Sequence, residues 1–449
     1  MKFTRQVEKE LKQWQSRVDR KPLILRGARQ VGKTTLIEYF AQSYKQFIHL
    51  NLEKKSDRYY FEKFEDVKKI VEALFIKNGF SAQLPQTLLF IDEIQESSKA
   101  IQLLRYFYED IPELHVVAAG SLLEFALGEV KSFPVGRVEY LYLFPLNFPE
   151  FLAARNKKNL ANELRTVPVK DIAHAALLEE FHIYAITGGM PELIKTFTLE
   201  KSMISLPRVF ESIWETYKKD IEKYGRSSTE KKIIKHIMET APEYLDQRVK
   251  FQNFGHSNYR SREVSEAMKS LDDAKVIQLI YPTTERTVPP KTNYRKSPRL
   301  QFLDTGLVNY ALGILPQLME VKDLSNAYKG ALIPHLITQE LISLNTFAYK
   351  KPHFWVRDKR QSSAEVDLVI PYKDKLIPVE IKSGSTGTLK SLQSFIDTSE
   401  HSYAIRIYFG TFKIEKHQTI KGKPYLLMNL PYYLGTQLHA YIAYFVEQH

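Results

Sequence analysis

Short apolar segments alternate with longer amphipathic segments along the first 150 residues of the chain. Apolar runs of this length predict buried strands, and apolar residues at helical spacing predict helices. We expect strands at residues 21–25, 47–52, 87–91 and 114–119, and helices at residues 34–44, 66–78 and 100–108. Such alternation is typical of a parallel sheet with helices on both faces.

The pattern changes after Pro145. Residues 146 to about 225 are expected to be mostly helical, with further helices at 229–239 and 261–273. Strands at 276–281 and 299–303 follow, and the order helix, helix, hairpin is typical of a winged helix-turn-helix. The rest of the chain predicts mixed α/β structure, with a helix near 331–345 and strands at 354–356, 365–371, 376–381 and 404–409.

Composition excludes several classes of protein. Of the 449 residues, 44% are hydrophobic and 26% are charged, which argues against a fibrous or disordered chain. The lack of cysteine excludes disulfides, thiolate metal sites and a cysteine nucleophile. We expect no membrane partner, because no run of about 20 residues is apolar throughout. The charged N-terminal residues lack a secretory signal, so we expect a cytoplasmic protein.

Positive charge is concentrated in one part of the chain. The formal net charge is +12, and residues 221–300 hold 16 Lys and Arg against 10 Asp and Glu. The segment 286–299 has five basic residues and no acidic residue. Clustered positive charge favours a polyanionic partner, although a solvated basic loop is the alternative.

Residues 27–34 fit the pattern G-x-x-x-x-G-K-[ST] at every position. In such a loop the backbone N–H groups point at phosphate oxygens, and the following helix directs its positive dipole end at the same anion. Lys33 is expected to contact the β- and γ-phosphates of ATP, and the hydroxyl of Thr34 to bind Mg²⁺. The predicted nucleotide contacts are Gly27, Ala28, Arg29, Gln30, Val31, Gly32, Lys33, Thr34 and Thr35.

A second element of the same site follows the apolar segment 88–91. Asp92 and Glu93 come directly after it, at the carboxyl end of a predicted parallel strand. Asp92 is expected to hold Mg²⁺ through water, and Glu93 to orient or deprotonate the attacking water. The two motifs together predict ATP hydrolysis.

Two further residues have two interpretations each. Ser121 follows the strand predicted at 114–119, where it either senses the γ-phosphate or caps a helix. Arg137 either neutralises charge during phosphoryl transfer, across a subunit boundary in a homo-oligomer, or forms a surface salt bridge.

The sequence resembles a prokaryotic family of AAA+-type P-loop ATPases whose C-terminal region is a domain of unknown function. The resemblance runs along nearly the whole chain, and its later motifs are more discriminating than the two generic ATPase motifs. It is carried by residues 25–34, 90–95, 119–121, 136–137, 143–146, 148–151, 188–192 and 302–307. It implies a helical lid that places Met190 and Pro191 near the adenine, with a plain helix-breaking turn as the alternative, and a winged helix after the lid.

The last domain resembles the PD-(D/E)xK nuclease superfamily. Glu380 and Lys382 are two residues apart, so they share one face of a strand. A hairpin symmetric about residues 373 and 374 places Asp367 opposite Glu380, and Glu365 opposite Lys382, with Cβ atoms about 5 Å apart. Two carboxylates this close suit a second Mg²⁺ or a Mn²⁺ ion, and Lys382 suits a charged transition state. An exposed hairpin with alternating charges is the alternative.

One departure from that resemblance concerns the first helix of the domain. The resembling family commonly has Gly-x-x-x-Glu there, whereas Pro334 stands four residues after Gly330 in this chain. Glu340, further along the helix, is either a substitute ligand or a solvated or capping residue. The metal site is therefore expected to be short of one ligand.

Basic residues mark a predicted DNA surface. The helix expected at 261–269 would enter the major groove, and the basic loop 286–299 would grip phosphates, with Tyr294 stacking on a sugar or base. Packing of the winged helix between domains is the alternative. The predicted DNA contacts are Arg260, Arg262, Lys291, Arg295, Lys296 and Arg299.

Together these observations predict an α/β protein of four parts. They are a P-loop AAA+-type ATPase core (1–155), a helical lid (156–225), a winged helix-turn-helix (226–322) and a restriction-endonuclease-like domain (323–449). The predicted function is an ATP-hydrolysing, DNA-binding protein with a nuclease-like domain. The alternative is a nucleotide-switched interaction protein whose nuclease-like domain is catalytically inactive.

Overall fold

The structure, a computed structural model, describes residues 2–121, 135–225, 227–321, 323–358, 364–382 and 389–449. The chain divides into two compact units. The N-terminal unit comprises Met1–Phe144, Asp273–Lys275 and Asn345–Tyr349, and the C-terminal unit comprises Pro145–Asp272, Val276–Leu344 and Lys350–His449. The four predicted domain boundaries are not tested by this division and stay a prediction.

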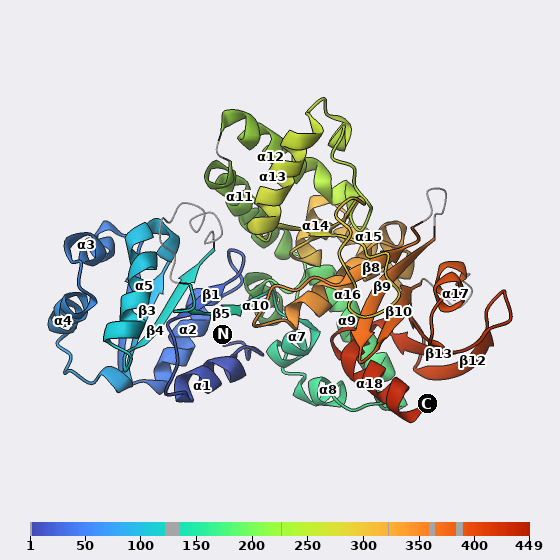
Figure 1. The fold of residues 1–449 in the computed structure, drawn as a ribbon, viewed down its shortest axis with the longest axis horizontal. Helices are drawn as coiled ribbons and strands as arrows, with labels where there is room; N and C mark the ends of the chain where they lie inside the picture. The colour runs from blue at the N-terminus through green and yellow to red at the C-terminus, as the bar shows by residue number, and fades with distance from the viewer. Residues whose placement is uncertain (1, 122–134, 226, 322, 359–363, 383–388) are drawn as a thin grey trace. The chain divides into compact units, whose positions relative to one another are not determined.

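The N-terminal unit is built around a five-stranded sheet with the order β2-β3-β4-β1-β5 (Figure 1). Its neighbouring strands are all parallel, which confirms the predicted sheet. The elements are α1 (Glu8–Ser16), β1 (Leu23–Arg26), α2 (Lys33–Phe40), β2 (Gln46–Asn51), α3 (Lys55–Lys63), α4 (Val67–Asn78), β3 (Thr87–Asp92), α5 (Ser98–Asp110), β4 (His115–Gly120) and β5 (Glu139–Tyr142).

Helices cover both faces of this sheet. On one face, Phe61 of α3 and Ile70 of α4 pack in a single apolar cluster with Val116 of β4. His115, the residue before Val116 in β4, points to the opposite face, where its ring lies 5.7 Å from that of Trp14 in α1. Strand β3 is buried at every position, and this explains the unbroken apolar run from Leu88 to Ile91.

Capping residues fix the ends of the helices. Asp66 accepts a hydrogen bond from Lys68 N at the start of α4, and Ser97 accepts one from Ala100 N at the start of α5. Gly79 ends α4 with a φ of 64°, a conformation that favours glycine. These short polar signals explain why both helices begin close to their predicted positions.

The C-terminal unit contains a six-stranded sheet with the order β12-β13-β11-β10-β9-β8 and a separate hairpin, β6-β7. Its elements are α7 (Phe148–Ala154), α8 (Lys158–Glu163), α9 (His174–Thr187), α10 (Pro191–Glu200), α11 (Leu206–Tyr224), α12 (Ser228–Thr240), α13 (Ser261–Asp273), β6 (Ile277–Ile280), β7 (Arg299–Phe302), α14 (Thr305–Ala311), α15 (Leu315–Glu320), α16 (Leu332–Ser343), β8 (His353–Val356), β9 (Glu365–Tyr372), β10 (Lys375–Ile381), α17 (Lys390–Ile396), β11 (Tyr403–Tyr408), β12 (Lys413–Gln418), β13 (Pro424–Pro431) and α18 (Leu438–Gln448).

The hairpin between β9 and β10 has the predicted register. Lys375 pairs with Tyr372, and the antiparallel pairing continues to Val379 opposite Leu368. Strand β10 then pairs in parallel with β11, which in turn pairs in parallel with β13. Because side chains alternate along a strand, this register puts Asp367 and Glu380 on neighbouring strands near the same point of the sheet.

The helices α12 and α13 and the hairpin β6-β7 follow one another in the predicted order. The loop that joins the two strands of the hairpin is fixed to strand β8. Thr283 N donates to Phe354 O at 2.8 Å, and Val356 N donates to Thr283 O at 3.0 Å. The start of this loop therefore extends the edge of the six-stranded sheet.

Helix α16 is apolar along most of its length and is buried at every position. Pro334 is its third residue, in the first turn, where a missing N–H breaks no helical hydrogen bond. The helix is nevertheless too short to cross a bilayer. No helix in the described part of the chain combines the length and apolar character that a membrane span requires.

Candidate functional site

The predicted phosphate-binding loop runs from the end of β1 to the start of α2. Gly27 has a φ of +152°, and a Cβ atom there would lie 2.2 Å from Leu143 O, so no other residue fits without displacing the backbone. Gly32 precedes α2 with a φ of 94°. The backbone thus takes the tight curve that a phosphate cradle needs.

Lys33 is buried inside this loop. Its ammonium group donates hydrogen bonds to Gly27 O at 3.0 Å and Ala28 O at 2.8 Å. Burial lowers the pKa of Lys33 to about 8, although Glu93 and Asp92 act in the opposite direction. The hydrogen bonds of this buried cation within the described residues go to carbonyl oxygens, so an anion that entered the loop would be strongly attracted.

Thr34 and Asp92 meet across the sheet. The Thr34 hydroxyl donates to Asp92 Oδ2 at 2.7 Å, and Glu93 N donates to Asp92 Oδ1 at 3.0 Å. The ring of His49 lies 3.7 Å from Asp92 Oδ2. Burial acts to raise the pKa of Asp92, but the contacts with His49, Thr34 and Glu93 N hold that pKa below its ordinary value. Asp92 therefore presents a charged carboxylate.

Glu93 is held by a residue whose role the sequence did not indicate. Gln95 donates from its amide nitrogen to Glu93 Oε2 at 2.6 Å. Glu93 itself has a φ of 50°, which places its side chain at a sharp turn after β3. A Cβ atom on Gly120 would lie 2.4 Å from Gln95 Oε1, so a glycine at the end of β4 makes room for this amide.

The other nucleotide-site candidates lie in different places. Ser121 is buried, and its hydroxyl has no hydrogen-bond partner among the described residues. Residue 122, where the alternative helix would start, lies outside the described residues. Arg137 forms an ion pair with Glu109 at 2.8 Å, and this contact lowers the pKa of Glu109.

Arg137 precedes β5, whose first residue Glu139 pairs with Leu23 at the start of β1. The P-loop follows the carboxyl end of β1. Arg137 therefore lies near the amino ends of the parallel strands, away from the P-loop. Arg137 is also 42% exposed and ion-paired there. It is therefore remote from the phosphate loop of its own chain.

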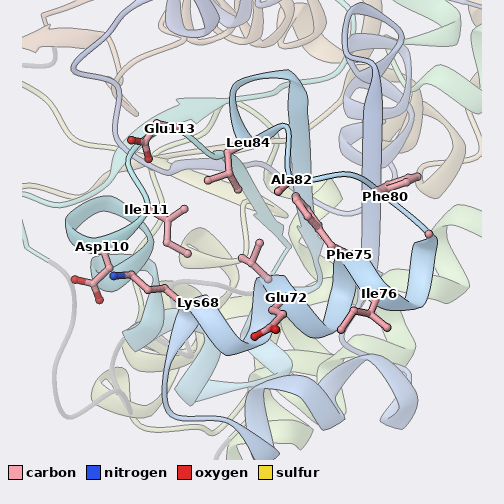
Figure 2. A pocket seen from close by; sticks show the side chains of 12 residues that line it. Lys68, Glu72, Phe75, Ile76, Phe80, Ala82, Leu84, Asp110, Ile111 and Glu113 are labelled. Carbon is pink, nitrogen blue, oxygen red and sulfur yellow. The ribbon is translucent and has the colours of Figure 1, made fainter.

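A cavity of about 490 Å³ opens near the amino end of β4, on the same side of the sheet as Arg137 (Figure 2). Apolar side chains line it, among them Phe75 of α4, Phe80 of the segment after α4 and Ile111 of the segment before β4. Lys68, Glu72 and Asp110 also line it. Its position before β4 separates it from the P-loop, so it is not part of the nucleotide site.

In the C-terminal unit, three of the motifs quoted above meet. Gly189 N donates to Asp304 Oδ2 at 2.6 Å, and Leu146 N donates to Gly189 O at 2.7 Å. Burial raises the pKa of Asp304 to about 6, although the backbone N–H groups it accepts from oppose this. Met190 is fully buried, and Pro191 begins α10. Placement of Met190 and Pro191 at an adenine stays a prediction.

Glu340 is occupied away from the predicted nuclease residues. Its carboxylate accepts hydrogen bonds from Phe148 N, at 3.1 Å, and from the Tyr184 hydroxyl, at 2.6 Å. Phe148 is the first residue of α7, so Glu340 caps that helix from α16. Burial raises the pKa of Glu340 to about 8. The capping interpretation fits this geometry, but the residue is buried and not solvated.

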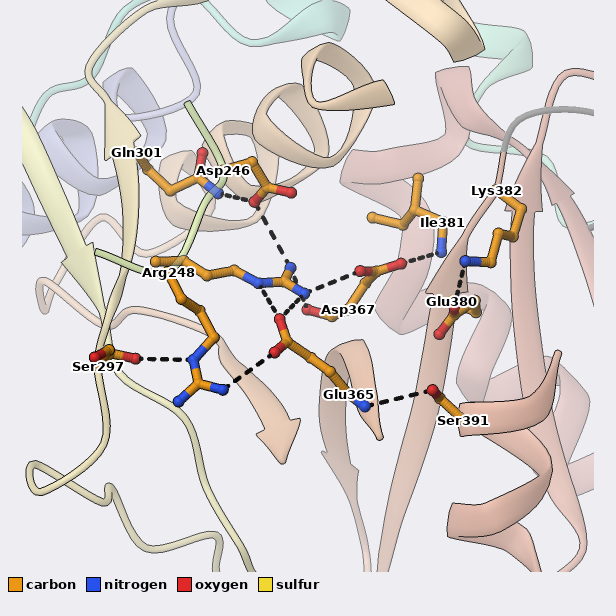
Figure 3. Close-up of polar contacts among 11 residues, drawn as sticks. Asp246, Arg248, Ser297, Gln301, Glu365, Asp367, Glu380, Ile381, Lys382 and Ser391 are labelled. Carbon is orange, nitrogen blue, oxygen red and sulfur yellow. Dashed lines mark hydrogen bonds and ion pairs between the residues drawn. The ribbon is translucent and has the colours of Figure 1, made fainter. Parts of the chain in front are cut away.

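The predicted nuclease residues form a cluster of ion pairs (Figure 3). Glu365 accepts a hydrogen bond from Arg299 Nε at 2.7 Å, and Asp367 Oδ1 accepts one from Arg299 Nη2 at 3.1 Å. Lys382 pairs instead with Glu380 at 2.8 Å. Within the described residues, no group of three or more His, Asp or Glu is arranged to hold a metal ion.

Burial changes the protonation of this cluster. Burial first, and Asp367 second, raise the pKa of Glu380 to about 8. Burial would lower the pKa of Lys382, but Glu380 raises it overall. Burial also raises the pKa of Asp246, beside Arg299, to about 7. The negative charge of Glu380 and of Asp246 is therefore reduced.

The predicted DNA contacts divide into two groups. Arg260, Arg262, Lys291 and Arg295 are exposed, and Lys296 is partly exposed. Arg299 is only 8% exposed and points into the carboxylate cluster, which differs from its expected place on a basic loop. The sequence grouped it with its neighbours because linear charge density does not show which way a side chain points.

Comparisons with known proteins match three segments of the chain. Residues 19–152 match the model of the AAA domain family. Residues 178–318 and 329–428 match two domains of unknown function, DUF8612 and DUF4143. A comparison with curated proteins found no match. The chain therefore contains an AAA-type P-loop ATPase domain, followed by two domains to which these matches assign no activity.

Solved structures are similar only at a low level. A Walker-type ATPase of Pyrococcus abyssi shares 14% identity over 70% of this chain and 98% of its own, with a TM-score of 0.45. A signal-transduction ATPase with a tetratricopeptide repeat sensor, from Pyrococcus horikoshii, shares 12% identity over 76% of this chain and 48% of its own, with a TM-score of 0.29. Unliganded Pif1 from Bacteroides sp. shares 19% identity over 40% of this chain and 49% of its own, with a TM-score of 0.21. TM-scores this low support no argument about function.

Proposed function

We propose that this chain is a Mg²⁺-dependent ATPase that binds ATP in its P-loop and cleaves the γ-phosphate. The observation that carries the proposal is the contact between Thr34 and Asp92, which lie 58 residues apart in sequence and 2.7 Å apart in space. This contact is accompanied by the buried Lys33, whose ammonium group donates to two carbonyl oxygens of the loop. A cation site beside a phosphate-binding loop is the arrangement that phosphoryl transfer needs.

The residues present fit a magnesium ion. Mg²⁺ prefers oxygen ligands and usually takes only one or two from protein carboxylates, with water and phosphate completing its shell. The Thr34 hydroxyl supplies one such oxygen, and the charged Asp92 carboxylate beside it would hold the ion through water. The bound ion would neutralise charge on the β- and γ-phosphates.

The chain's own groups would then act in sequence. Lys33 exchanges its two carbonyl contacts for phosphate oxygens, since a charge-assisted contact with an anion is stronger than one with a neutral carbonyl. Glu93 leaves Gln95 and orients the attacking water. The buried Ser121 hydroxyl is a candidate donor to the γ-phosphate.

Arg137 enters this proposal only through a second copy of the chain. Its distance from the P-loop of its own chain leaves an adjacent subunit as the place where it would act. A homo-oligomer in which Arg137 reaches the nucleotide of a neighbouring subunit is thus part of the proposal.

A helical lid is a further part of the proposal, in which Met190 and Pro191 lie near the adenine.

DNA binding is a second proposed function. It is supported by the exposed side chains of Arg260 and Arg262 at the start of α13 and of Lys291 and Arg295 on the basic loop. Exposed arginines and lysines attract phosphates and release counterions. Tyr294, 75% exposed between these basic residues, is available to stack on a sugar or base.

The C-terminal domain is proposed to bind a partner and not to cleave nucleic acid. The motifs in this domain are compatible with an active nuclease or with a catalytically inactive docking domain of nuclease-like fold. The contacts of Arg299 with Glu365 and Asp367 favour the inactive form, because they occupy the oxygens that a metal would need.

ATP turnover by purified variants tests the first proposal. Lys33→Ala is expected to reduce ADP production by at least about 100-fold, because it removes a charge that contacts the transferred phosphate. Lys12→Ala, an exposed lysine on α1, is the matched control and should leave turnover unchanged. Equal turnover by wild type and Lys33→Ala would exclude hydrolysis at this loop.

A further inference from the structure

The guanidinium group of Arg299 contacts the carboxylates of Asp246, Glu365 and Asp367, which Figure 3 labels. These three carboxylates, with Glu380 beside Lys382, are called the carboxylate ring. Glu365 and Asp367 of β9 both accept hydrogen bonds from the guanidinium group. Asp246 lies 3.6 Å from Arg299 Nη1. A second arginine, Arg248, lies 3.6 Å from the other oxygen of Glu365. One guanidinium thus neutralises acidic groups contributed by two segments that are far apart in sequence.

The oxygens of this ring are already in use. Asp367 accepts from Arg299 with Oδ1 and from Ile381 N, at 2.8 Å, with Oδ2. Both oxygens of Glu365 face arginines. Glu380 uses Oε1 for Lys382, and only its Oε2 is buried without a hydrogen-bond partner among the described residues. Among the oxygens of Glu365, Asp367 and Glu380, a divalent cation would find only one without a partner in the described residues, so these three carboxylates do not fit a metal ion as they stand.

Arg299 is held in place by packing as well as by charge. Its guanidinium carbon lies 4.6 Å from the centre of the Phe354 ring on β8. Its side chain is only 9% exposed, so solvent has little access to the guanidinium group. A planar guanidinium that contacts two carboxylates and an aromatic face is far better fixed than a lysine would be. Its fixed positive charge also repels any cation that approaches the ring.

We propose that Arg299 is the resident cation of this carboxylate ring. It keeps divalent cations out of the ring in this chain, and Glu365, Asp367 and Glu380 bind Mg²⁺ or Mn²⁺ only when the guanidinium is removed. The ring therefore joins β7 to β9 by charge and does not activate water. This inference concerns the C-terminal unit alone, and it deepens the proposal that this domain serves interaction and not cutting.

Manganese binding to the full-length, nucleotide-free chain tests the first half of the inference. Free Mn²⁺ is counted by electron paramagnetic resonance during titration of wild type and Asp367→Asn. We expect the same number of bound ions in both, because the ring holds none. One additional ion in wild type that Asp367→Asn removes would overturn the proposal.

The second half is tested by adding Arg299→Ala and Arg299→Ala/Asp367→Asn to the same titration. Arg299→Ala is expected to bind about one more Mn²⁺ than the double variant. Loss of the buried cation should lower its Tm by roughly 5–15 °C, and Mn²⁺ should restore part of that loss. Arg299→Lys keeps the charge and should gain no ion, and Arg295→Ala, on the exposed loop, is the control for loss of a nearby arginine.

A folded Arg299→Ala that gains no Mn²⁺ relative to the double variant would overturn the latent metal site. Should Arg299→Ala fail to fold, the comparison of wild type with Asp367→Asn still decides whether the ring holds a metal. ATP turnover, measured in the same samples, reports on the P-loop separately. Normal turnover in every variant is expected, so failure of the ring proposal and failure of the ATPase proposal remain distinguishable.

Discussion

Thr34 donates a hydrogen bond to Asp92 Oδ2 across the parallel sheet of the N-terminal unit. The two residues belong to α2 and β3, and strand β4 separates β3 from β1, the strand that leads into the P-loop. The contact brings a hydroxyl and a carboxylate together where the carboxyl ends of the strands meet. It brings two motifs that are far apart in sequence to the proposed cation site.

Glu93 is expected to be needed for hydrolysis and not for nucleotide binding. Glu93→Gln keeps the shape of the side chain and removes the base, so ATP should bind nearly as in wild type. Turnover should fall about 10²- to 10³-fold, within the range for loss of general base catalysis. Single-turnover measurements with labelled ATP separate the two effects.

Glu62→Gln is the matched control for that variant. Glu62 is an exposed carboxylate on α3, so its neutralisation should leave both binding and turnover unchanged. Loss of ATP binding in Glu93→Gln, or turnover equal to that of wild type, would contradict the role assigned to Glu93.

ATP binding is expected to take up a proton at about pH 8.5. The pKa of Lys33 is lowered to about 8 in the nucleotide-free chain, chiefly by burial, whereas an unfolded lysine titrates near 10.4. Bound phosphate favours the charged amine, so affinity should fall as pH rises above about 8, by at most tenfold per unit. Calorimetry in buffers of different ionisation enthalpy measures the proton taken up.

The same shift affects stability in a defined direction. Between pH 8 and about 10.4 the unfolded chain binds more protons at Lys33 than the folded chain does, so this group's contribution to stability rises with pH across that window. Lys33→Met should lack this rise.

For the proton-uptake prediction, ATP binding at pH 8.5 without any proton uptake would contradict the position of Lys33 in the loop.

DNA retention is expected to depend on the arginines at the start of α13. Arg260→Ala and Arg262→Ala should each weaken binding and reduce the slope of log affinity against log salt by about one. Lys416→Ala, exposed on β12, is the control. DNA binding by wild type that does not change with salt concentration would argue against phosphate contacts by α13. The same holds if the slope of log affinity against log salt is unchanged in both arginine variants.

The nucleotide site was predictable because local signals define it. The glycines of residues 27–34 indicate a tightly curved backbone. An apolar segment followed by Asp92 and Glu93 indicates the carboxyl end of a parallel strand. The part played by Gln95 was not predictable. A glutamine two residues after a glutamate has no distinctive pattern, and only the turn after β3 brings its amide to Glu93.

The C-terminal cluster shows where sequence reasoning stops. The β9-β10 register follows from a short turn and alternating side chains, and the structure confirms it. Arg299 is 66 residues from Glu365, and no local rule connects them. Its inward direction depends on the pairing of β7 with β6 and on packing against Phe354.

The missed elements of the fold have physical causes. Helix α1 has no side-chain cap, and α3 buries only Phe61, so neither shows a clear signal. Strand β12 is mostly exposed and polar, as an edge strand is. Strand β13 begins and ends with proline, which is typical of a loop in isolation.

The most direct measurement is a titration of ATP against the purified chain, with Mg²⁺ and with EDTA. Thr34→Val is compared with wild type, because it keeps the shape of the side chain and removes the hydroxyl that contacts Asp92. We expect wild type to bind ATP more tightly with Mg²⁺ than with EDTA, and Thr34→Val to lose that difference. No binding by wild type, or the same Mg²⁺ dependence in both proteins, would contradict a nucleotide site built on Thr34 and Asp92.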